Sequence, residues 1–235
     1  MIQHNSNPPQ HFTKYFQKRE CLVPTWRGWL LITLIGFGLA LTFVKTIHPF
    51  LSVSTSSTDT KANADAILVV EGWVPDYALD ASIKEFKTGK YKKLYVTGGP
   101  MERAASLTEF KTYAELGAAA LVERGLPANL VQAVPATEIG KDRTYNSAIM
   151  LRTWLRSRQL SPRSYHIISL GAHARRTRLL FEKVVDDNVQ VNITAVKDIY
   201  FDPAQWWRSS EGVRTVVNET TAYIYVRLFF WPIRK

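Results

Sequence analysis

The stretch Tyr165–Lys183 reads YHIISLGAHARRTRLLFEK and decides the fold of this chain. It opens with a short apolar run over 166–170, which is typical of a buried strand, and Gly171 interrupts that run. From His173 onward, apolar residues recur at helical spacing. A strand, a tight turn and a helix therefore place His173 at the carboxyl end of a strand, where open α/β sheets bind their ligands.

The rest of the chain repeats this alternation of strands and helices. Further strands are predicted at 66–70, 91–97, 130–134 and 189–195. Helices are predicted at 80–86, 104–124 and 144–158. Such an alternation forms βαβ units with right-handed crossovers. We therefore predict an α/β fold, a Rossmann-like three-layer α/β/α sandwich with a mainly parallel sheet of about five strands.

An uncharged segment, Trp29–Val44, precedes this domain. With Lys45 extending toward the headgroups, the apolar stretch covers 22–50, which exceeds the ~20 residues that a bilayer requires. The alternative is a cleaved signal peptide, but the segment starts late and lacks a small-x-small site directly after its core. We predict one N-terminal transmembrane helix that remains as a signal anchor. The basic excess before it places the N-terminus in the cytoplasm and the domain outside.

These features divide the chain into four parts. They are a cytoplasmic tail (1–27), a transmembrane signal anchor (28–50), a polar linker (51–63) and the α/β domain (64–235). The domain ends in a predicted helix over 212–233 that becomes apolar, with Arg227 as an interruption. Three alternatives remain for this helix: it crosses the membrane, packs on the sheet, or lies at the membrane surface.

The composition restricts the partners. The chain has a formal net charge of +10, and the residues from Ala62 onward keep +6, with 24 Lys and Arg against 18 Asp and Glu. This excess indicates an anionic small molecule or lipid, or else an ordinary basic surface. The single Cys21 excludes a zinc finger and no arginine–aromatic cluster is present, so we expect no nucleic acid. Walker A, GxGxxG, GxSxG and metal-ligand spacings are all absent, and no cofactor is predicted.

Parallel strands end at one edge of the sheet, where the loops that follow them meet. Gly98 and Gly99 follow the second predicted strand and form either a nest of N–H groups for an anion or a plain turn. Thr144 or the preceding Asp142 would cap the next helix. Arg143 is a cation at a helix N-terminus, which opposes the helix dipole unless it faces an anion.

Basic side chains and two carboxylates are further candidate site residues at this edge. His173 and Arg176 are three residues apart on one helix face, where Arg can grip a phosphate and His can move a proton. Arg175 is either a third ligand for the anion or a solvated surface charge. Glu71 ends a buried strand and Glu219 lies in the apolar C-terminal helix. Each needs a partner, so each is either a functional carboxylate or half of a buried ion pair with arginine.

These motifs, taken in order, resemble the SanA/ElyC/YdcF family, also called the domain-of-unknown-function 218 family. The matching elements are the strand at 66–70, Thr97-Gly98-Gly99, Arg143-Thr144 with Ser147, and His173-x-x-Arg176. The resemblance covers roughly 65–225. It implies that the listed polar residues, Ser147 included, bind a ligand. It also implies a Rossmann-like domain anchored in the bacterial inner membrane, facing the periplasm, and linked to cell-envelope integrity and peptidoglycan or lipid-carrier metabolism.

Two segments depart from the family pattern. The sequence VEGWVP at 70–75 replaces the Gly-rich first loop of many members. Thr-Tyr-Asn-Ser at 144–147 stands where many members carry Thr-x-Glu-Asn, so a catalytic carboxylate at Asn146 is not expected here. The family has no agreed reaction that could be carried over.

The sequence thus predicts an envelope-biogenesis protein that binds a polyprenyl phosphate or a nucleotide-like molecule. Arg143 and Arg176 would hold the phosphate, and His173 or Glu71 would move a proton in phosphoester hydrolysis or transfer. The alternative is a non-catalytic sensor or scaffold of the envelope, for which the pair Trp206-Trp207 would offer an exposed aromatic surface.

Overall fold

The computed structural model describes residues 24–55, 65–89, 91–101, 109–137 and 142–232. The chain divides into two compact units, Met1–Thr42 and Phe43–Lys235, and each is described by itself. The long helix α1 (Trp26–Leu51) belongs to both.

The second unit is built on a five-stranded sheet. Its strands are β1 (Ala66–Glu71), β2 (Leu94–Gly98), β3 (Val131–Pro135), β4 (Ser164–Leu170) and β5 (Gln190–Val196). All neighbouring strands are parallel, in the order β3-β2-β1-β4-β5. This confirms the predicted α/β fold. The strand order reverses between β1 and β4, and such a reversal opens a crevice at the carboxyl ends of the strands.

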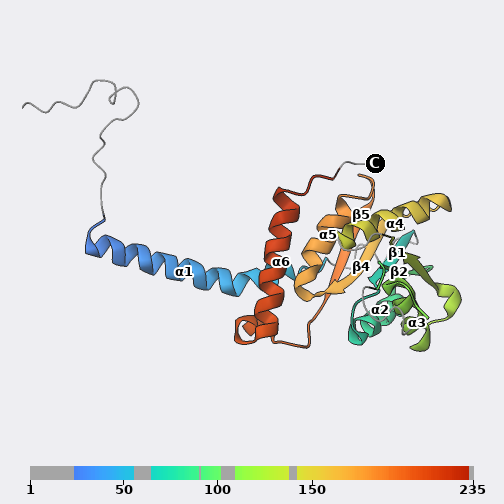
Figure 1. The fold of residues 1–235 in the computed structure, drawn as a ribbon, viewed down its shortest axis with the longest axis horizontal. Helices are drawn as coiled ribbons and strands as arrows, with labels where there is room; N and C mark the ends of the chain where they lie inside the picture. Colours follow the sequence, from blue (N-terminus) through green and yellow to red (C-terminus); the bar gives the residue numbers. More distant parts are fainter. Residues whose placement is uncertain (1–23, 56–64, 90, 102–108, 138–141, 233–235) are drawn as a thin grey trace, which may run out of the picture. The chain divides into compact units, whose positions relative to one another are not determined.

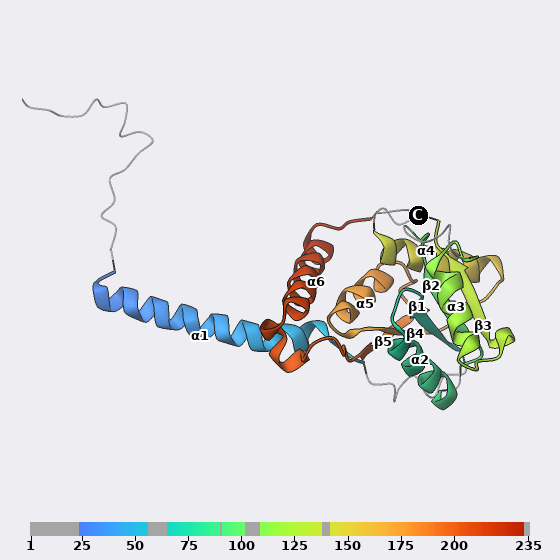
Figure 2. The same ribbon diagram turned by 60° about the horizontal axis from the view of Figure 1, so that its bottom comes forward.

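Helices cover both faces of the sheet, which makes three layers (Figures 1 and 2). On one face, Leu68 and Val70 of β1 belong to the same core cluster as α2 (Asp76–Thr88) and α3 (Tyr113–Glu123). On the other face, Ile67 and Val69 pack with α4 (Arg143–Ser157) and α5 (Ala174–Glu182). Successive side chains of a strand alternate between faces, and β1 is buried at every position because both faces are covered.

The predicted helix over 104–124 is wrong in its start. Residues 104–108 lie outside the described residues, and 109–112 are not helical. Helix α3 begins at Tyr113, because Thr112 and Glu115 form a capping box. The Thr112 hydroxyl accepts from the amide of Glu115 at 3.2 Å, and the Glu115 carboxylate accepts from the amide of Thr112 at 2.9 Å.

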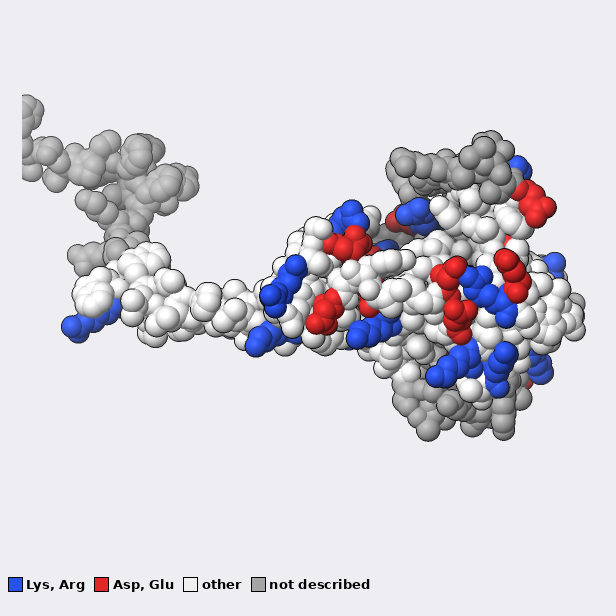
Figure 3. Space-filling model, turned by 90° about the horizontal axis from the view of Figure 1, so that it is seen from below, with Lys and Arg blue, Asp and Glu red and all other residues white. Residues whose placement is uncertain are grey.

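The part of α1 in the first unit is apolar and exposed. Among the described residues, α1 is the one helix long and apolar enough to cross a membrane, judged by length and composition. Figure 3 shows no charged side chain on the middle of this helix in the face presented. The membrane type and the orientation of the helix stay predictions.

The end of α1 belongs to the core of the second unit. Leu51 is completely buried and Ile47 nearly so, in a cluster with Val216 and Trp206. Beyond the helix, the segment 52–55 runs along the edge strand β5, where the Thr55 amide donates to the carbonyl of Ile193 at 2.8 Å. The compact unit therefore extends upstream of the boundary predicted at 64, while residues 56–63 of the predicted linker lie outside the described ones.

The C-terminal part contains a short helix, η3 (Pro203–Arg208), and α6 (Ser210–Leu228). Helix α6 ends five residues earlier than predicted, and it packs on α5 and η3. The prediction of an exposed aromatic pair is wrong for Trp206. This residue is buried, and its indole N–H donates to the carbonyl of Val44 at 2.9 Å. Trp207 is partly exposed.

Candidate functional site

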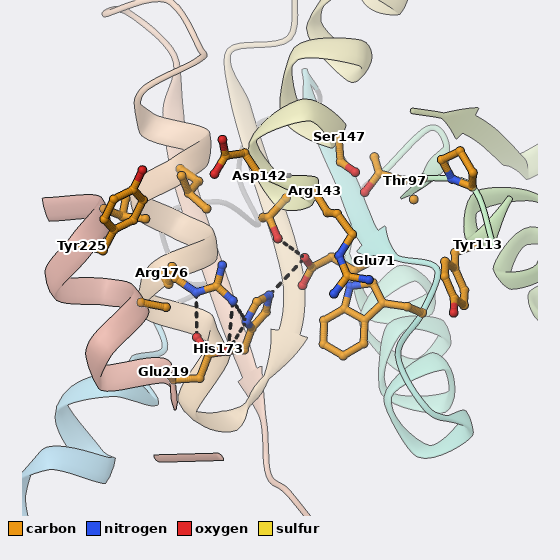
Figure 4. Close-up of a pocket in the computed structure, with 18 residues that line it drawn as sticks. Glu71, Thr97, Tyr113, Asp142, Arg143, Ser147, His173, Arg176, Glu219 and Tyr225 are labelled. Atoms are coloured by element: carbon orange, nitrogen blue, oxygen red, sulfur yellow. Dashed lines mark hydrogen bonds and ion pairs between the residues drawn. The ribbon is translucent and has the colours of Figure 1, made fainter. Parts of the chain in front are cut away.

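A pocket of about 540 Å³ lies at the carboxyl ends of the strands, at the reversal of strand order. Figure 4 shows the side chains that line it. Its walls come from β1, β2, α3, α4, α5 and α6 and the loops between them. The polar residues of the wall are Glu71, Thr97, Tyr113, Asp142, Arg143, Thr144, Ser147, His173, Arg176, Glu219 and Tyr225. The loops that the sequence predicts to meet therefore do meet.

Glu71, the last residue of β1, is 3% exposed and accepts hydrogen bonds at both carboxylate oxygens. Ser169 donates to Oε2 at 2.8 Å. Thr144 lies 3.4 Å from Oε1, and so does Nε2 of His173. These contacts satisfy a carboxylate that would otherwise be costly to bury.

His173 lies between two carboxylates. Its Nδ1 is 3.0 Å from Oε1 of Glu219, on α6, while its Nε2 faces Glu71. The edge of its ring meets the indole of Trp73, with centroids 5.2 Å apart. A ring with an acceptor at each nitrogen is best satisfied as the imidazolium, in which both nitrogens donate.

Arg176 completes a chain of alternating charges (Figure 4). Its Nε and Nη2 donate to the two oxygens of Glu219 at 2.7 and 3.0 Å. Nη2 also lies 2.9 Å from Nδ1 of His173. Two N–H donors cannot bond each other, so in the imidazolium state both groups donate to the same Glu219 oxygen. The order Glu71–His173–Glu219–Arg176 then alternates in sign and sums to zero.

The pKa values follow from this chain. Burial alone would lower the pKa of His173, but the charge of Glu71 and the hydrogen bond to Glu219 raise it to about 9. Burial alone would raise the pKa of Glu219, but His173 and Arg176 lower it to about 2. The pKa of Glu71 is also lowered, because the charge of His173 and the bonds from His173 and Ser169 outweigh its burial. At neutral pH His173 therefore carries a proton between two ionised carboxylates.

Helix α4 enters the pocket with its N-terminus, and Asp142, one of the two predicted N-cap residues, holds that position. Asp142 occupies the N-cap position in a left-handed conformation, φ 47°, and its side chain makes no capping hydrogen bond. Thr144 directs its hydroxyl to Glu71 instead. Arg143 begins the helix and lines the pocket, so this cation lies where an incoming anion would meet the helix N-terminus.

Gly98 and Gly99 line the pocket, as does Ser147. A Cβ at Gly98 would lie 2.8 Å from Cβ of Tyr113, so close packing against α3 is sufficient to require glycine there. The carbonyl of Gly99 accepts from the amide of Tyr113 at 2.9 Å. Packing of α3 against the sheet thus accounts for Gly98 without a ligand, and the role of this turn in anion binding stays a prediction.

Arg175 is not among the residues that line the pocket. Its Nε donates to the carbonyl of Phe50, and its guanidinium lies 3.9 Å from the centroid of the Phe50 ring. The structure therefore assigns Arg175 to the end of α1, in place of the predicted role in anion binding. The sequence left two alternatives for Arg175, a ligand of the anion and a solvated surface charge, and its contacts with Phe50 match neither of them.

Sequence reasoning missed Ser169, Tyr113 and Tyr225, whereas Thr97 belongs to a motif of the family resemblance and Trp73 to the first loop at 70–75. Trp73 and Ser169 contact the charged chain, and Tyr113 and Tyr225 line the pocket. Thr97 is 1% exposed, and its hydroxyl has no hydrogen-bond partner in the described part of the chain. The available signal was position: Thr97 and Ser169 are hydroxyl residues at the ends of otherwise apolar strands.

Within the described residues, no group of three or more His, Cys, Asp or Glu side chains could hold a metal ion. Comparisons with family models, curated proteins and solved structures found no match to this chain. The fold and the site thus define an α/β protein with a Rossmann-like parallel sheet and a candidate membrane helix. The resemblance to the SanA/ElyC/YdcF family stays a prediction.

Proposed function

We propose that this chain is a membrane-anchored cell-envelope biogenesis protein that binds a phosphorylated ligand in the strand-end pocket and hydrolyses or transfers its phosphoester. The observation that carries the proposal is the position of His173 in the pocket wall, with Nδ1 facing Glu219 and Nε2 facing Glu71, an arrangement that favours the protonated ring. A buried group that keeps a proton at neutral pH can give it to a leaving oxygen. A polyprenyl phosphate or a nucleotide-like molecule is the ligand class that suits a tethered domain.

In hydrolysis, the oxygen of a water molecule would bond to phosphorus while the bond from phosphorus to the ester oxygen breaks. His173 would turn its Nε2–H away from Glu71, where the contact is long at 3.4 Å, and give that proton to the departing oxygen, and the proton lost by the water would restore the imidazolium. Glu71 is a weak base because its pKa is lowered, so its part is to orient His173 and to hold its charge. Phosphoryl transfer depends mainly on such positioning and electrostatics.

Arg143, at the N-terminus of α4, is the cation that would meet the phosphate. Arg176 is less suited to the predicted clamp, because Glu219 already occupies two of its five N–H donors. Removing Arg176 would also leave the buried charged chain with an excess of one negative charge, and the resulting loss of stability would confuse a binding test. Arg143→Ala is therefore the sharper probe of anion binding.

The test uses the full chain in nonionic detergent, with thermal unfolding followed against inorganic phosphate, nucleoside diphosphates and short-chain prenyl phosphates. A ligand at 100 times its Kd adds about 2.7 kcal/mol, or roughly 5–10 °C for a chain of this size. We expect a shift that Arg143→Ala abolishes and that Arg178→Ala preserves, because Arg178 pairs with Glu182 outside the pocket. Phosphate binding would be contradicted if none of the phosphate compounds raised Tm, or if Arg143→Ala and Arg178→Ala showed equal shifts.

Turnover is tested with the ligand that gives the shift. His173→Gln should retain the thermal shift but lose 10²- to 10⁴-fold in kcat/KM, the range typical for loss of an acid–base group. The rate of the unchanged chain should fall as the pH rises through about 9, where His173 loses its proton.

One observation favours a second function, a non-catalytic binding or sensing module of the envelope. Every charged group of the chain Glu71–His173–Glu219–Arg176 already has a partner of opposite charge. Such a network can simply brace β1, α5 and α6 around a ligand. In that case ligand binding would survive in all assays, and no phosphate release would be detected from any compound that binds.

A further inference from the structure

The outward face of helix α6 carries an apolar stripe. Val213, Val217, Ile224 and Leu228 fall within a narrow sector of the helix at 100° per residue, and we call them the α6 stripe. The side chains of Val217, Ile224 and Leu228 are 50%, 46% and 57% exposed. An apolar face that stays exposed along a whole helix marks a surface that another phase or partner covers.

A neighbouring face of α6, about 100° around the helix from the centre of the stripe, packs against the end of α1. Val216 packs with Leu51 in one core cluster, and the ring of Tyr223 meets that of Phe50 edge-on, with centroids 5.5 Å apart. These contacts lie within seven residues of Val44, where the uncharged segment of α1 ends. At 1.5 Å per residue, that is about 10 Å along the helix axis. A membrane crossed by α1 would therefore begin close to α6.

Basic and aromatic side chains accompany the stripe. Lys45 and Arg227 are exposed, and Trp231, just after α6, is 78% exposed. Nζ of Lys183 lies 5.5 Å from the centroid of the Trp231 ring. Tryptophan and basic residues together are typical of the headgroup layer, where the indole lies among the headgroups and the cations meet anionic lipids.

We propose that the α6 stripe lies on the surface of a lipid bilayer that contains anionic headgroups, as an interfacial helix parallel to the membrane. This proposal rests on the membrane anchoring within the proposed function, and not on its ligand or its chemistry. Helix α6 contains Glu219 and Arg227 within its apolar half and is not among the described helices apolar enough to cross a membrane, so it lies on the bilayer and does not span it. The direct packing of α6 on the end of α1 favours lipid over a protein partner as the occupant.

The test measures the surroundings of single nitroxide labels on the full chain in nanodiscs of phosphatidylcholine with a quarter phosphatidylglycerol. Cys21→Ser removes the one native cysteine. Labels then follow from Val217→Cys, Ile224→Cys and Leu228→Cys. Leu34→Cys, in the exposed apolar part of α1, is the lipid reference. Val122→Cys and Leu160→Cys, apolar and exposed on α3 and after α4, are the water references.

Collision of each label with oxygen, which concentrates in lipid, is compared with collision with a water-soluble nickel chelate. We expect the three α6 labels to have at least a threefold higher ratio of oxygen to nickel collisions than the labels at 122 and 160. A ratio equal to these water references would overturn the proposal, while a lipid-like signal at 34 would still support the anchor. Low access to both reagents at the α6 labels would show a protein partner, such as a second copy, and would equally overturn it. A water-like signal at 34 would overturn the anchor and the α6 surface together.

Discussion

Glu219→Gln removes one negative charge from the centre of the charged chain with little change in shape. The native carboxylate accepts from His173 at 3.0 Å and from Arg176 at 2.7 and 3.0 Å, and its side chain is 16% exposed. Its pKa falls from 4.5 to about 2 in the folded protein. This lowered pKa corresponds to about 3 kcal/mol of folding stability at neutral pH. The raised pKa of His173 reports the same contacts from the other side, so the two effects are not added.

The sign of each shift fixes the pH range. The stability from Glu219 is present above about pH 4.5 and is lost as the pH falls toward 2. The stability from His173 is present below about pH 6.5 and is lost as the pH rises through about 9. The contribution of the pair is therefore largest between about pH 4.5 and 6.5. The variant should melt below the unchanged chain by roughly 6–12 °C in that window, and the gap should narrow toward pH 9.

The assay is thermal unfolding of the full chain in detergent at pH 5, 6, 7, 8 and 9. Glu182→Gln is the matched control, because Glu182 pairs with Arg178 on the exposed side of α5. The control should shift Tm by no more than a degree or two at any pH. A Glu219→Gln variant that melts with the unchanged chain, or a gap that stays constant up to pH 9, would refute a charged His173 held by two carboxylates.

Three further results are expected. Gly72→Ala should destabilise the domain by about 1–3 kcal/mol or more, because the added Cβ would lie 2.1 Å from the carbonyl oxygen of Tyr113. Gly171→Ala is the control and should be tolerated, because the nearest atoms to its Cβ would lie at 3.8 Å. The denaturant midpoints of the two variants are compared. Leu51→Ala should lower the stability of the domain by about 2–5 kcal/mol in a thermal melt, because Leu51 is fully buried. Leu31 is exposed in α1, so Leu31→Ala should leave the melting temperature of the domain unchanged. Equal melting of both variants would contradict the packing of the α1 end on the domain. Thr97→Val should leave Tm unchanged or raised, because the buried hydroxyl has no hydrogen-bond partner in the described residues. The same change should weaken the phosphate-dependent thermal shift. A drop in Tm of several degrees would show that the hydroxyl is hydrogen-bonded in the folded protein.

The sequence predicts the sheet well because each strand is a local signal. The run that forms β1 is apolar at every position except Glu71, and that pattern follows directly from burial on both faces; β4 is also buried at six of its seven positions although Ser164, His166 and Ser169 are polar. The start of α3 was missed although its capping box, Thr112 to Glu115, is also local. The preceding residues have good helix propensity, and propensity alone does not locate the residue at which a helix begins.

The site was harder to predict because it depends on contacts distant in sequence and on helix phase. Arg175 and Arg176 are neighbours, but adjacent residues of a helix point about 100° apart. Arg176 faces the pocket and Arg175 faces Phe50. The 3-10 turn at Gly171–His173, which precedes α5, determines which of the two arginines faces the pocket. The two carboxylates that His173 contacts, Glu71 and Glu219, are 102 and 46 residues away in the sequence. The sequence indicates that a buried carboxylate needs a partner, but not which cation provides it.

Helix α6 links the pocket to the end of α1. Glu219 faces His173 and Arg176, while Val216 and Tyr223, one turn to either side on the same helix face, pack against the end of α1. A displacement of α6 relative to α1 would therefore also move the carboxylate that keeps His173 protonated. Because protein cores are close-packed and transmit strain, a change at Leu51 should reach the pocket through this single helix. Leu51→Ala combined with Glu219→Gln should then cost less stability than the two changes added together, since α6 is already loosened by either one.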